Sequence, residues 1–133
     1  MLVNYADVTE LPGLAASKEQ LERIFHRYHF ARQFSQGKEV LEVACGAGIG
    51  LGYLRSAAKR ITGVDIESEN LEIAAEYYKE SKNIEIKLMD AHRLTFENHA
   101  FDLVILYEAI YYLENPGQFI REAYRVLRQG GGR

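Results

Sequence analysis

Four glycines at alternate positions, directly after a short apolar segment, constrain the fold of this chain more than any other feature. The segment Glu39–Ala44 is mostly apolar, which is typical of a buried strand. Gly46, Gly48, Gly50 and Gly52 follow it. Glycine lets a backbone turn sharply and lets a ligand approach without a Cβ in the way. Because glycines this dense exceed what a turn requires, we interpret the segment as a strand-to-helix turn that faces a ligand.

Strands and helices alternate along the rest of the chain. Further strands are expected at Arg60–Ile66, Ile84–Met89 and Phe101–Tyr107. Helices are expected from Ser17, from the glycine turn through Arg55–Lys59, from Ser68, and from Asn115-Pro116 to Gly130. This alternation predicts an α/β domain with a parallel sheet and right-handed crossovers. Ligands of such sheets bind at the carboxyl ends of the strands, so the residues after each strand carry the functional information.

Local signals support these helices. Ser17 with Gln20 forms a capping box, Ser68 is a candidate cap for the third helix, and Asn115 precedes a proline at a first helical position. The last helix has an expected buried stripe of Phe119, Ile120, Ala123, Val126 and Leu127. Residues 1–16 lack periodicity, so we expect an N-terminal arm followed by one domain over 17–133.

Composition excludes several classes of protein. The chain has 133 residues, enough for one domain, and its 16 basic and 19 acidic side chains give a net charge of −3, unlike a dedicated nucleic-acid binder. A lone cysteine excludes an intramolecular disulfide and a cysteine zinc cluster. His26 and His29 lack a third ligand, so no metal is expected. No apolar run is long enough to span a membrane and no signal peptide is evident, so we expect a cytoplasmic protein.

Acidic residues follow two of the strands. Asp65 ends the second strand, where a carboxylate can accept hydrogen bonds from both hydroxyls of a ribose. The alternative, a cap on the next helix, is less favoured because Ser68 is better placed for it. Asp90-Ala91 follows the third strand and can bind an adenine edge, or Asp90 is a solvated loop acid. Tyr111 and Tyr112 after the fourth strand either line a pocket or belong to the core.

Taken in order, these features resemble the class I S-adenosylmethionine-dependent methyltransferases. The resemblance rests on Glu-x-x-Cys-Gly-x-Gly at Glu42–Gly48, on Asp65, on Asp90-Ala91 and on Phe101–Ile105, and the tail Phe119–Gly131 also fits. It implies a Rossmann-like parallel sheet with flanking helices. It also implies transfer of a methyl group from S-adenosylmethionine to a small-molecule acceptor. The cofactor carries the activation, so the protein supplies binding and alignment and no fixed triad is required.

The resemblance also implies roles for single residues. Glu42 would hold the loop and approach the methionine part of the cofactor, which would pass along Ala44, Gly46 and Gly48. Asp65 would bind the ribose, Ile66 would pack on the adenine, and Asp90 with Ala91 would bind its edge. Tyr107 would lie near the methionine end, and Tyr28 of the leading helix would act as a lid. Cys45 would belong to the cofactor-binding loop, as a structural residue rather than a nucleophile. The only candidates for a general base, by location or type alone, are Tyr107, Glu108, His92 and His29.

Two departures from the family pattern stand out. Ala44 occupies a position where the family often has glycine, and its methyl group narrows the loop. The usual C-terminal strands do not follow Gly131, so the chain corresponds to the N-terminal half of the fold. Phe101–Tyr107 would then be a sheet edge, which invites association. Either the chain is a fragment of a longer protein or a second copy covers this edge as a homodimer.

Two other functions remain as alternatives. A nicotinamide-dependent oxidoreductase requires Gly-x-Gly-x-x-Gly, and this spacing fails because Leu51 stands at the sixth position from Gly46. A non-catalytic or partner-dependent cofactor-binding half-domain is the second alternative, because the far half of the sheet is missing. Arg121, Arg125 and Arg128 are interpreted as a solvated helix face rather than a nucleic-acid patch.

Overall fold

The computed structural model describes residues 18–107 and 112–129. Three sequence predictions lie outside the described residues: the arm over 1–16, the cap at Ser17 and the placement of Tyr111. The general-base candidate Glu108 lies outside them as well.

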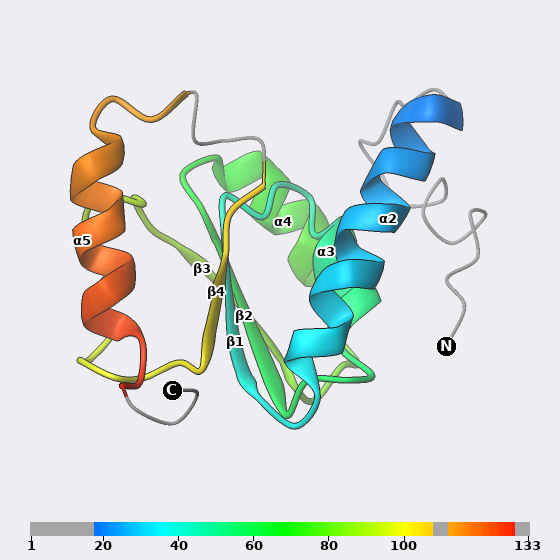
Figure 1. Cartoon of the computed structure of the whole chain (residues 1–133). Helices are drawn as coiled ribbons and strands as arrows, with labels where there is room; N and C mark the ends of the chain where they lie inside the picture. The colour runs from blue at the N-terminus through cyan, green and yellow to red at the C-terminus, as the bar shows by residue number, and fades with distance from the viewer. Residues whose placement is uncertain (1–17, 108–111, 130–133) are drawn as a thin grey trace.

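A parallel sheet of four strands forms the centre of the described structure (Figure 1). Its strands are β1 (Glu39–Val43), β2 (Arg60–Asp65), β3 (Ile84–Leu88) and β4 (Leu103–Ile105), in the spatial order β3-β2-β1-β4. Every neighbouring pair is parallel. The predicted α/β fold with a parallel, Rossmann-like sheet is therefore confirmed. Among the described residues β4 pairs only with β1, so it is an edge strand.

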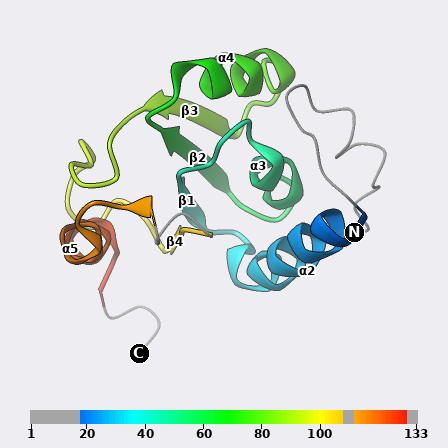
Figure 2. The ribbon, with the colours of Figure 1, turned by 90° about the horizontal axis from the view of Figure 1, so that it is seen from above.

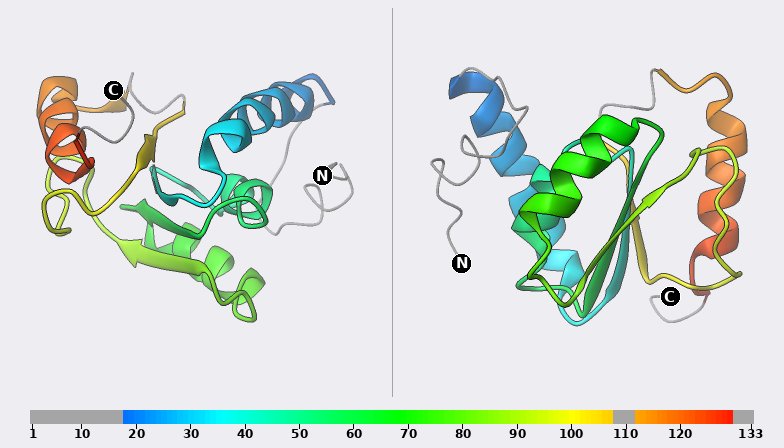
Figure 3. Two further views of the ribbon diagram at one scale, coloured as in Figure 1. Left: turned by 60° about the horizontal axis from the view of Figure 1, so that its bottom comes forward. Right: turned by 180° about the vertical axis from the view of Figure 1, so that it is seen from behind.

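Helices cover both faces of the sheet (Figures 2 and 3). One face carries α2 (Lys18–Ser35), α3 (Ile49–Leu54) and α4 (Ser68–Tyr77), and the other carries α5 (Pro116–Val126). Two apolar clusters fill the spaces between the layers. Alternate residues of β1 belong to different clusters: Val40 packs toward α2 and α3, whereas Leu41 and Val43 pack toward α5. The central strand is thus buried on both sides, as parallel strands usually are.

Three elements are clearly shorter than the sequence predicts. Helix α3 begins at Ile49 inside the glycine run and ends at Leu54, so the prediction of a helix through Arg55–Lys59 was wrong. Helix α5 ends at Val126, so its predicted extension to Gly130, with Leu127 in the buried stripe, was also wrong. The fourth strand covers only Leu103–Ile105, because Phe101 pairs with Leu127 beyond α5 instead of joining the sheet.

The helix caps follow the prediction in one case and contradict it in another. The Asn115 side chain accepts the backbone N–H of Gln118 at 3.1 Å and Pro116 opens α5, which confirms that cap. Ser68 is not a cap: it is the first residue of α4, and Glu67 at the cap position makes no side-chain hydrogen bond there. In the stripe of α5, Phe119 and Val126 are buried, but Ile120 is 48% exposed and was wrongly assigned to it.

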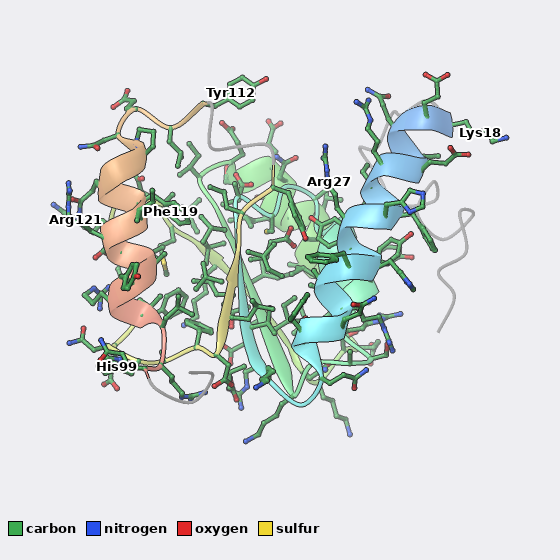
Figure 4. The ribbon with its side chains drawn as sticks, viewed as in Figure 1. Lys18, Arg27, His99, Tyr112, Phe119 and Arg121 are labelled. Atoms are coloured by element: carbon green, nitrogen blue, oxygen red, sulfur yellow. The ribbon has the colours of Figure 1, made fainter. Side chains whose placement is uncertain are left out.

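Arg125 fastens α5 to the segment between β3 and β4. Its guanidinium donates to the carbonyl oxygens of Leu94 and Phe96, both at 2.7 Å, and pairs with Glu122 at 2.9 Å. Glu122 in turn accepts the backbone N–H of Leu94 at 2.7 Å. The expectation of a merely solvated arginine face was therefore wrong for Arg125. Figure 4 shows Phe119 on the side of α5 that faces the sheet and Arg121 on the opposite side.

Candidate functional site

A cleft of about 360 Å³ opens at the carboxyl ends of the strands. Five residues that the sequence proposed as binding residues line it together: Ala44, Asp65, Ile66, Asp90 and Ala91. They come from the ends of three successive strands, as the parallel topology requires. The remaining lining residues are Val43, Met89, His92, Tyr112, Leu113 and Glu114.

Two large side chains at this cleft are exposed to solvent. Ile66 is 65% exposed and Tyr112 is 86% exposed, although both line the cleft. Large apolar groups held in the open beside a concave surface are typical of a ligand site. Of the two readings left open for Tyr112, the structure therefore favours pocket lining over core (Figure 4).

Asp65 joins two segments through its carboxylate. Oδ2 accepts the backbone N–H of Gly46 at 2.7 Å, and Oδ1 accepts that of Glu67 at 2.9 Å. The sequence favours Ser68 over Asp65 as the residue that caps the next helix. This prediction was wrong, because the Asp65 side chain accepts the backbone N–H of Glu67 just before α4. Each carboxylate oxygen has two acceptor sites, so both oxygens keep one for a further donor.

Most of the glycines make room for side chains of this protein. A Cβ at Gly48 would lie 3.0 Å from the Tyr78 ring, and a Cβ at Gly52 would lie 2.5 Å from the Tyr78 hydroxyl. A Cβ at Gly50 would overlap the Tyr28 ring. For these three, packing against tyrosine side chains explains the glycine without a ligand.

Gly46 differs from the other three glycines of this loop. Its φ is +59°, and no atom lies within 4 Å of the position that a Cβ would take. Ala44, two residues earlier and lining the cleft, has a φ of 58°, a conformation that L-residues adopt with strain. The loop therefore has left-handed backbone at both Ala44 and Gly46, and Ala44 lines the cleft.

Glu42, Tyr28 and Tyr107 form a separate cluster on the α2 side of the sheet. The buried Tyr28 hydroxyl donates to Glu42 Oε2, and its ring lies 5.2 Å edge-on to that of Tyr107. Tyr107 donates to the carbonyl of Arg27 at 3.0 Å. None of the three is among the residues that line the cleft. Tyr28 lies in the core, packed against Gly50, and not over the cleft.

Burial dominates the electrostatics of this cluster. Desolvation raises the pKa of Glu42 to about 8, although the Tyr28 hydrogen bond lowers it and the charge of Asp65 raises it further. Glu42 is therefore mostly a neutral acid at pH 7. Its Oε1 is buried and has no hydrogen-bond partner among the described residues. A Cβ at Gly50 would lie 2.6 Å from that oxygen, so Glu42 supports the glycine loop from below.

Cys45 packs inside the loop. Its Sγ would lie 2.9 Å from a Cβ at Gly63, so the thiol occupies the space that this glycine of β2 leaves open. Burial, and next the charges of Glu42 and Asp65, raise the pKa of the thiol well above its usual range. A thiol that stays protonated is a poor nucleophile, in keeping with the structural role expected for it.

The Asp90 side chain is held by its neighbour. Oδ1 accepts the backbone N–H of His92 at 2.8 Å and lies 2.8 Å from Nδ1 of the same residue. These contacts, the backbone hydrogen bond first, lower the pKa of Asp90 below its ordinary value. The carboxylate is consequently ionised at neutral pH and acts only as an acceptor.

Two absences concern the described parts of the chain alone. Within 18–107 and 112–129, no cluster of three or more His, Cys, Asp or Glu side chains is suited to hold a metal ion. No helix in these ranges combines the length and the apolar character that crossing a membrane requires.

Sequence reasoning missed part of the cleft. It considered His92 only as a general base by type, and it did not single out Met89, Leu113 or Glu114. The position of His92 directly after Asp90-Ala91 was a usable signal. Leu113 and Glu114 follow an interruption of the helix-and-strand pattern and offered none.

Comparison with known proteins agrees with this geometry. The family model described as "Methyltransferase domain" matches residues 41–132. A phthiotriol/phenolphthiotriol dimycocerosates methyltransferase of Mycobacterium leprae is 34% identical over 98% of this chain and 51% of its own length. A probable S-adenosylmethionine-dependent methyltransferase of Mycolicibacterium smegmatis is 29% identical over 91% of this chain and 46% of its own.

A solved structure adds a three-dimensional match. The crystal structure of the [4+2]-cyclase SpnF has a TM-score of 0.76 and 28% identity, over 92% of this chain and 46% of that one. This chain spans about half the length of the curated relatives it matches. The matched family model covers β1 through α5, including every strand end that borders the cleft. The chain therefore belongs to the family of S-adenosylmethionine-dependent methyltransferases.

Proposed function

We propose that this chain binds S-adenosylmethionine in the cleft at the carboxyl ends of its strands and takes part in methyl transfer to a small-molecule acceptor. One observation supports this most: Ala44, Asp65, Ile66 and Asp90-Ala91, which follow three different strands, converge on one cleft. The net charge of −3 favours a small-molecule acceptor over a nucleic acid.

The chemistry of the cleft fits an adenosyl group. Asp65 keeps one acceptor site on each oxygen for the two ribose hydroxyls, while its other sites hold the loop. The exposed Ile66 packs against the adenine ring, and Asp90 accepts its amino group beside Ala91. Ala44 and Gly46 leave the backbone accessible to the methionine part, which runs toward Glu42 and Tyr107.

The bound cofactor would supply an activated methyl group, and the side chains of this protein would bind and align it. Tyr28 and Glu42 support the loop from beneath, and Cys45 and Gly48 fix its shape from within through buried contacts. We assign no general base.

Isothermal titration calorimetry tests this proposal directly. S-adenosylmethionine, S-adenosylhomocysteine and NAD are titrated in parallel into monodisperse protein whose fold is checked by circular dichroism. We expect both adenosyl ligands to bind and NAD to give no heat. Folded protein that binds neither adenosyl ligand, or that binds NAD alone, would contradict the proposal.

A cofactor-binding half-domain that needs a partner for turnover is the second candidate, because β4 pairs only with β1 among the described residues. The unpaired edge of β4 is its natural partner surface, and we propose that a second copy covers it as a homodimer. Light scattering coupled to size exclusion tests this: a dimer is expected, and a stable monomer would contradict it.

A further inference from the structure

His92 connects two walls of the cleft through its two ring nitrogens. Nδ1 lies 2.8 Å from Asp90 Oδ1 on one wall. Nε2 accepts the backbone N–H of Asn115 at 3.1 Å, directly after the segment 112–114 that forms the opposite wall. The His92 carbonyl also accepts the side-chain amide of Gln118 at 3.2 Å. His92 is thus fixed from the loop after β3 and from the start of α5.

These contacts determine which nitrogen carries the proton. A backbone N–H can only donate, so the Asn115 contact requires Nε2 to be an unprotonated acceptor. The neutral imidazole then has its hydrogen on Nδ1, where it donates to Asp90. Asn115 is itself held as the N-cap of α5, so the donor that selects this tautomer belongs to a fixed helix end.

Because of these contacts, the two oxygens of the Asp90 carboxylate differ in their hydrogen bonding. Oδ1 receives two hydrogen bonds, both from His92, whereas no described residue donates to Oδ2. The carboxylate plane is therefore set by His92 rather than by the ligand. Since Asp90 lines the cleft, a ligand meets an acceptor whose direction is already fixed.

We propose that His92 is a positioning residue that makes the cleft selective for a 6-amino purine over a 6-oxo purine. This rests on the proposed function, in which Asp90 accepts the adenine amino group. A fixed, ionised acceptor pairs with an N–H donor and repels a carbonyl oxygen at the same place, and polar sites discriminate strongly in this way. A freely rotating carboxylate would turn away from the carbonyl and lose most of that discrimination.

The test compares S-adenosylhomocysteine with S-inosylhomocysteine, which carries oxygen in place of the amino group, by calorimetry. We expect the wild-type protein to prefer the adenosyl ligand by about 100-fold, the range of one charge-assisted hydrogen bond. His92→Gln can keep an acceptor for the Asn115 N–H but removes the side-chain donor to Asp90, so that only the backbone N–H of residue 92 still holds Oδ1. The preference should therefore fall below about 10-fold. His92→Ala removes both side-chain contacts and should lower the preference as well.

His92→Asn is the rescue variant, because its side-chain amide can donate to Asp90 from the position of Nδ1. We expect it to keep the preference while binding both ligands more weakly, since the Asn115 contact is lost. His99→Gln is the matched control: its Nδ1 bonds the Leu127 carbonyl at 2.9 Å, at the opposite end of the molecule from Tyr112 (Figure 4).

The possible results separate this inference from the function on which it rests. If folded wild-type protein binds neither ligand, the proposed function fails. If it binds but His92→Gln and His92→Ala keep the wild-type ratio, or weaken both ligands equally, His92 is only structural and the inference is overturned. If these two variants lose the preference for the adenosyl ligand and His92→Asn keeps it, the positioning role of His92 is supported.

Discussion

The carboxylate of Asp65 accepts the backbone N–H of Gly46 at 2.7 Å, so the acid that ends β2 holds the open turn that follows β1. The other oxygen accepts the N–H of Glu67, at the start of α4. The proposed ribose-binding residue is therefore also the link between two loops. Ligand affinity and loop order are coupled through one side chain.

Replacing Asp65 by asparagine should lower both stability and affinity. The asparagine oxygen can accept one of the two N–H groups, but its NH₂ faces the other and leaves it without a partner. We expect a loss of about 1–3 kcal/mol in the free energy of unfolding, the cost of a buried unsatisfied group. We also expect affinity for S-adenosylhomocysteine to fall more than about tenfold. Urea denaturation and calorimetry measure the two effects.

Glu76→Gln is the control for Asp65→Asn, because Glu76 is an exposed acid of α4 that pairs only with Lys79. It should leave both quantities nearly unchanged. Equal behaviour of the two variants would refute the linking role of Asp65.

Ala44→Gly should stabilise the protein. Ala44 has a φ of 58°, where an L-residue is strained by roughly 1–2 kcal/mol. Glycine removes this strain, but it also makes the unfolded chain more flexible, which offsets about half of the gain in stability. A rise in melting temperature of a few degrees is expected by calorimetric scanning. Ala47→Gly, in the same loop but without a positive φ, should lower it. Destabilisation by both changes would show that Ala44 is not strained.

Alanine substitutions at Gly50 and at Gly46 should affect different properties: mainly stability at Gly50, and mainly ligand affinity at Gly46. A Cβ at Gly50 would overlap the Tyr28 ring, so Gly50→Ala should cost about 3 kcal/mol or more in stability. A Cβ at Gly46 meets nothing, so Gly46→Ala should cost only about 1 kcal/mol of backbone strain and mainly weaken ligand binding. Thermal unfolding measures the stability of the two variants, and calorimetry measures their affinity for the ligand. A Gly46→Ala protein with unchanged affinity would argue against ligand contact at this glycine.

Stability should fall as pH rises from about 5 to about 8 because of Glu42. Its folded pKa of about 8 lies above the ordinary value of 4.5, so over this range the unfolded chain releases a proton that the folded protein keeps. The contribution to the slope is at most about 1.4 kcal/mol per pH unit. Glu42→Gln cannot titrate and should remove this part of the dependence in urea denaturation at several pH values. Parallel curves for the two proteins would contradict the raised pKa.

Arg125→Ala should destabilise the protein by about 1–3 kcal/mol, because it removes the donor to the Leu94 and Phe96 carbonyls and the cation that pairs with Glu122. Arg121→Ala, on the same helix, removes only contacts with Gln118 and should change stability by less than about 0.5 kcal/mol. Chemical denaturation measures both. A similar loss in the two variants would mean that Arg125 does not fasten the segment between β3 and β4.

The order of elements and the place of the cleft could be predicted because they depend on local signals. Short apolar runs identified all four strands, and Asn115-Pro116 identified the start of α5. The parallel topology then put the residues after β2 and β3 at one edge, where Asp65 and Asp90 do line a common cleft.

The roles of the glycines could not be predicted, because their partners are distant in sequence. A glycine indicates that a Cβ is not tolerated, but not whether a ligand or a side chain takes its place. The Tyr78 hydroxyl, which donates to the Gly48 carbonyl at 2.7 Å, lies 30 residues away. The contacts of Asp65 and His92 with backbone N–H groups could not be predicted either. Every residue except proline carries such a donor, so the sequence does not indicate which one is used.

Tyr28 of α2 and Tyr78, the residue directly after α4, fill the spaces left by the loop glycines, so the shape of that loop depends on the helices behind it. Substituting one of these aromatic rings should therefore change the affinity for a nucleotide-like donor. Every residue that touches the donor can stay the same. For protein engineers, these two tyrosines offer control of the loop from outside the cleft.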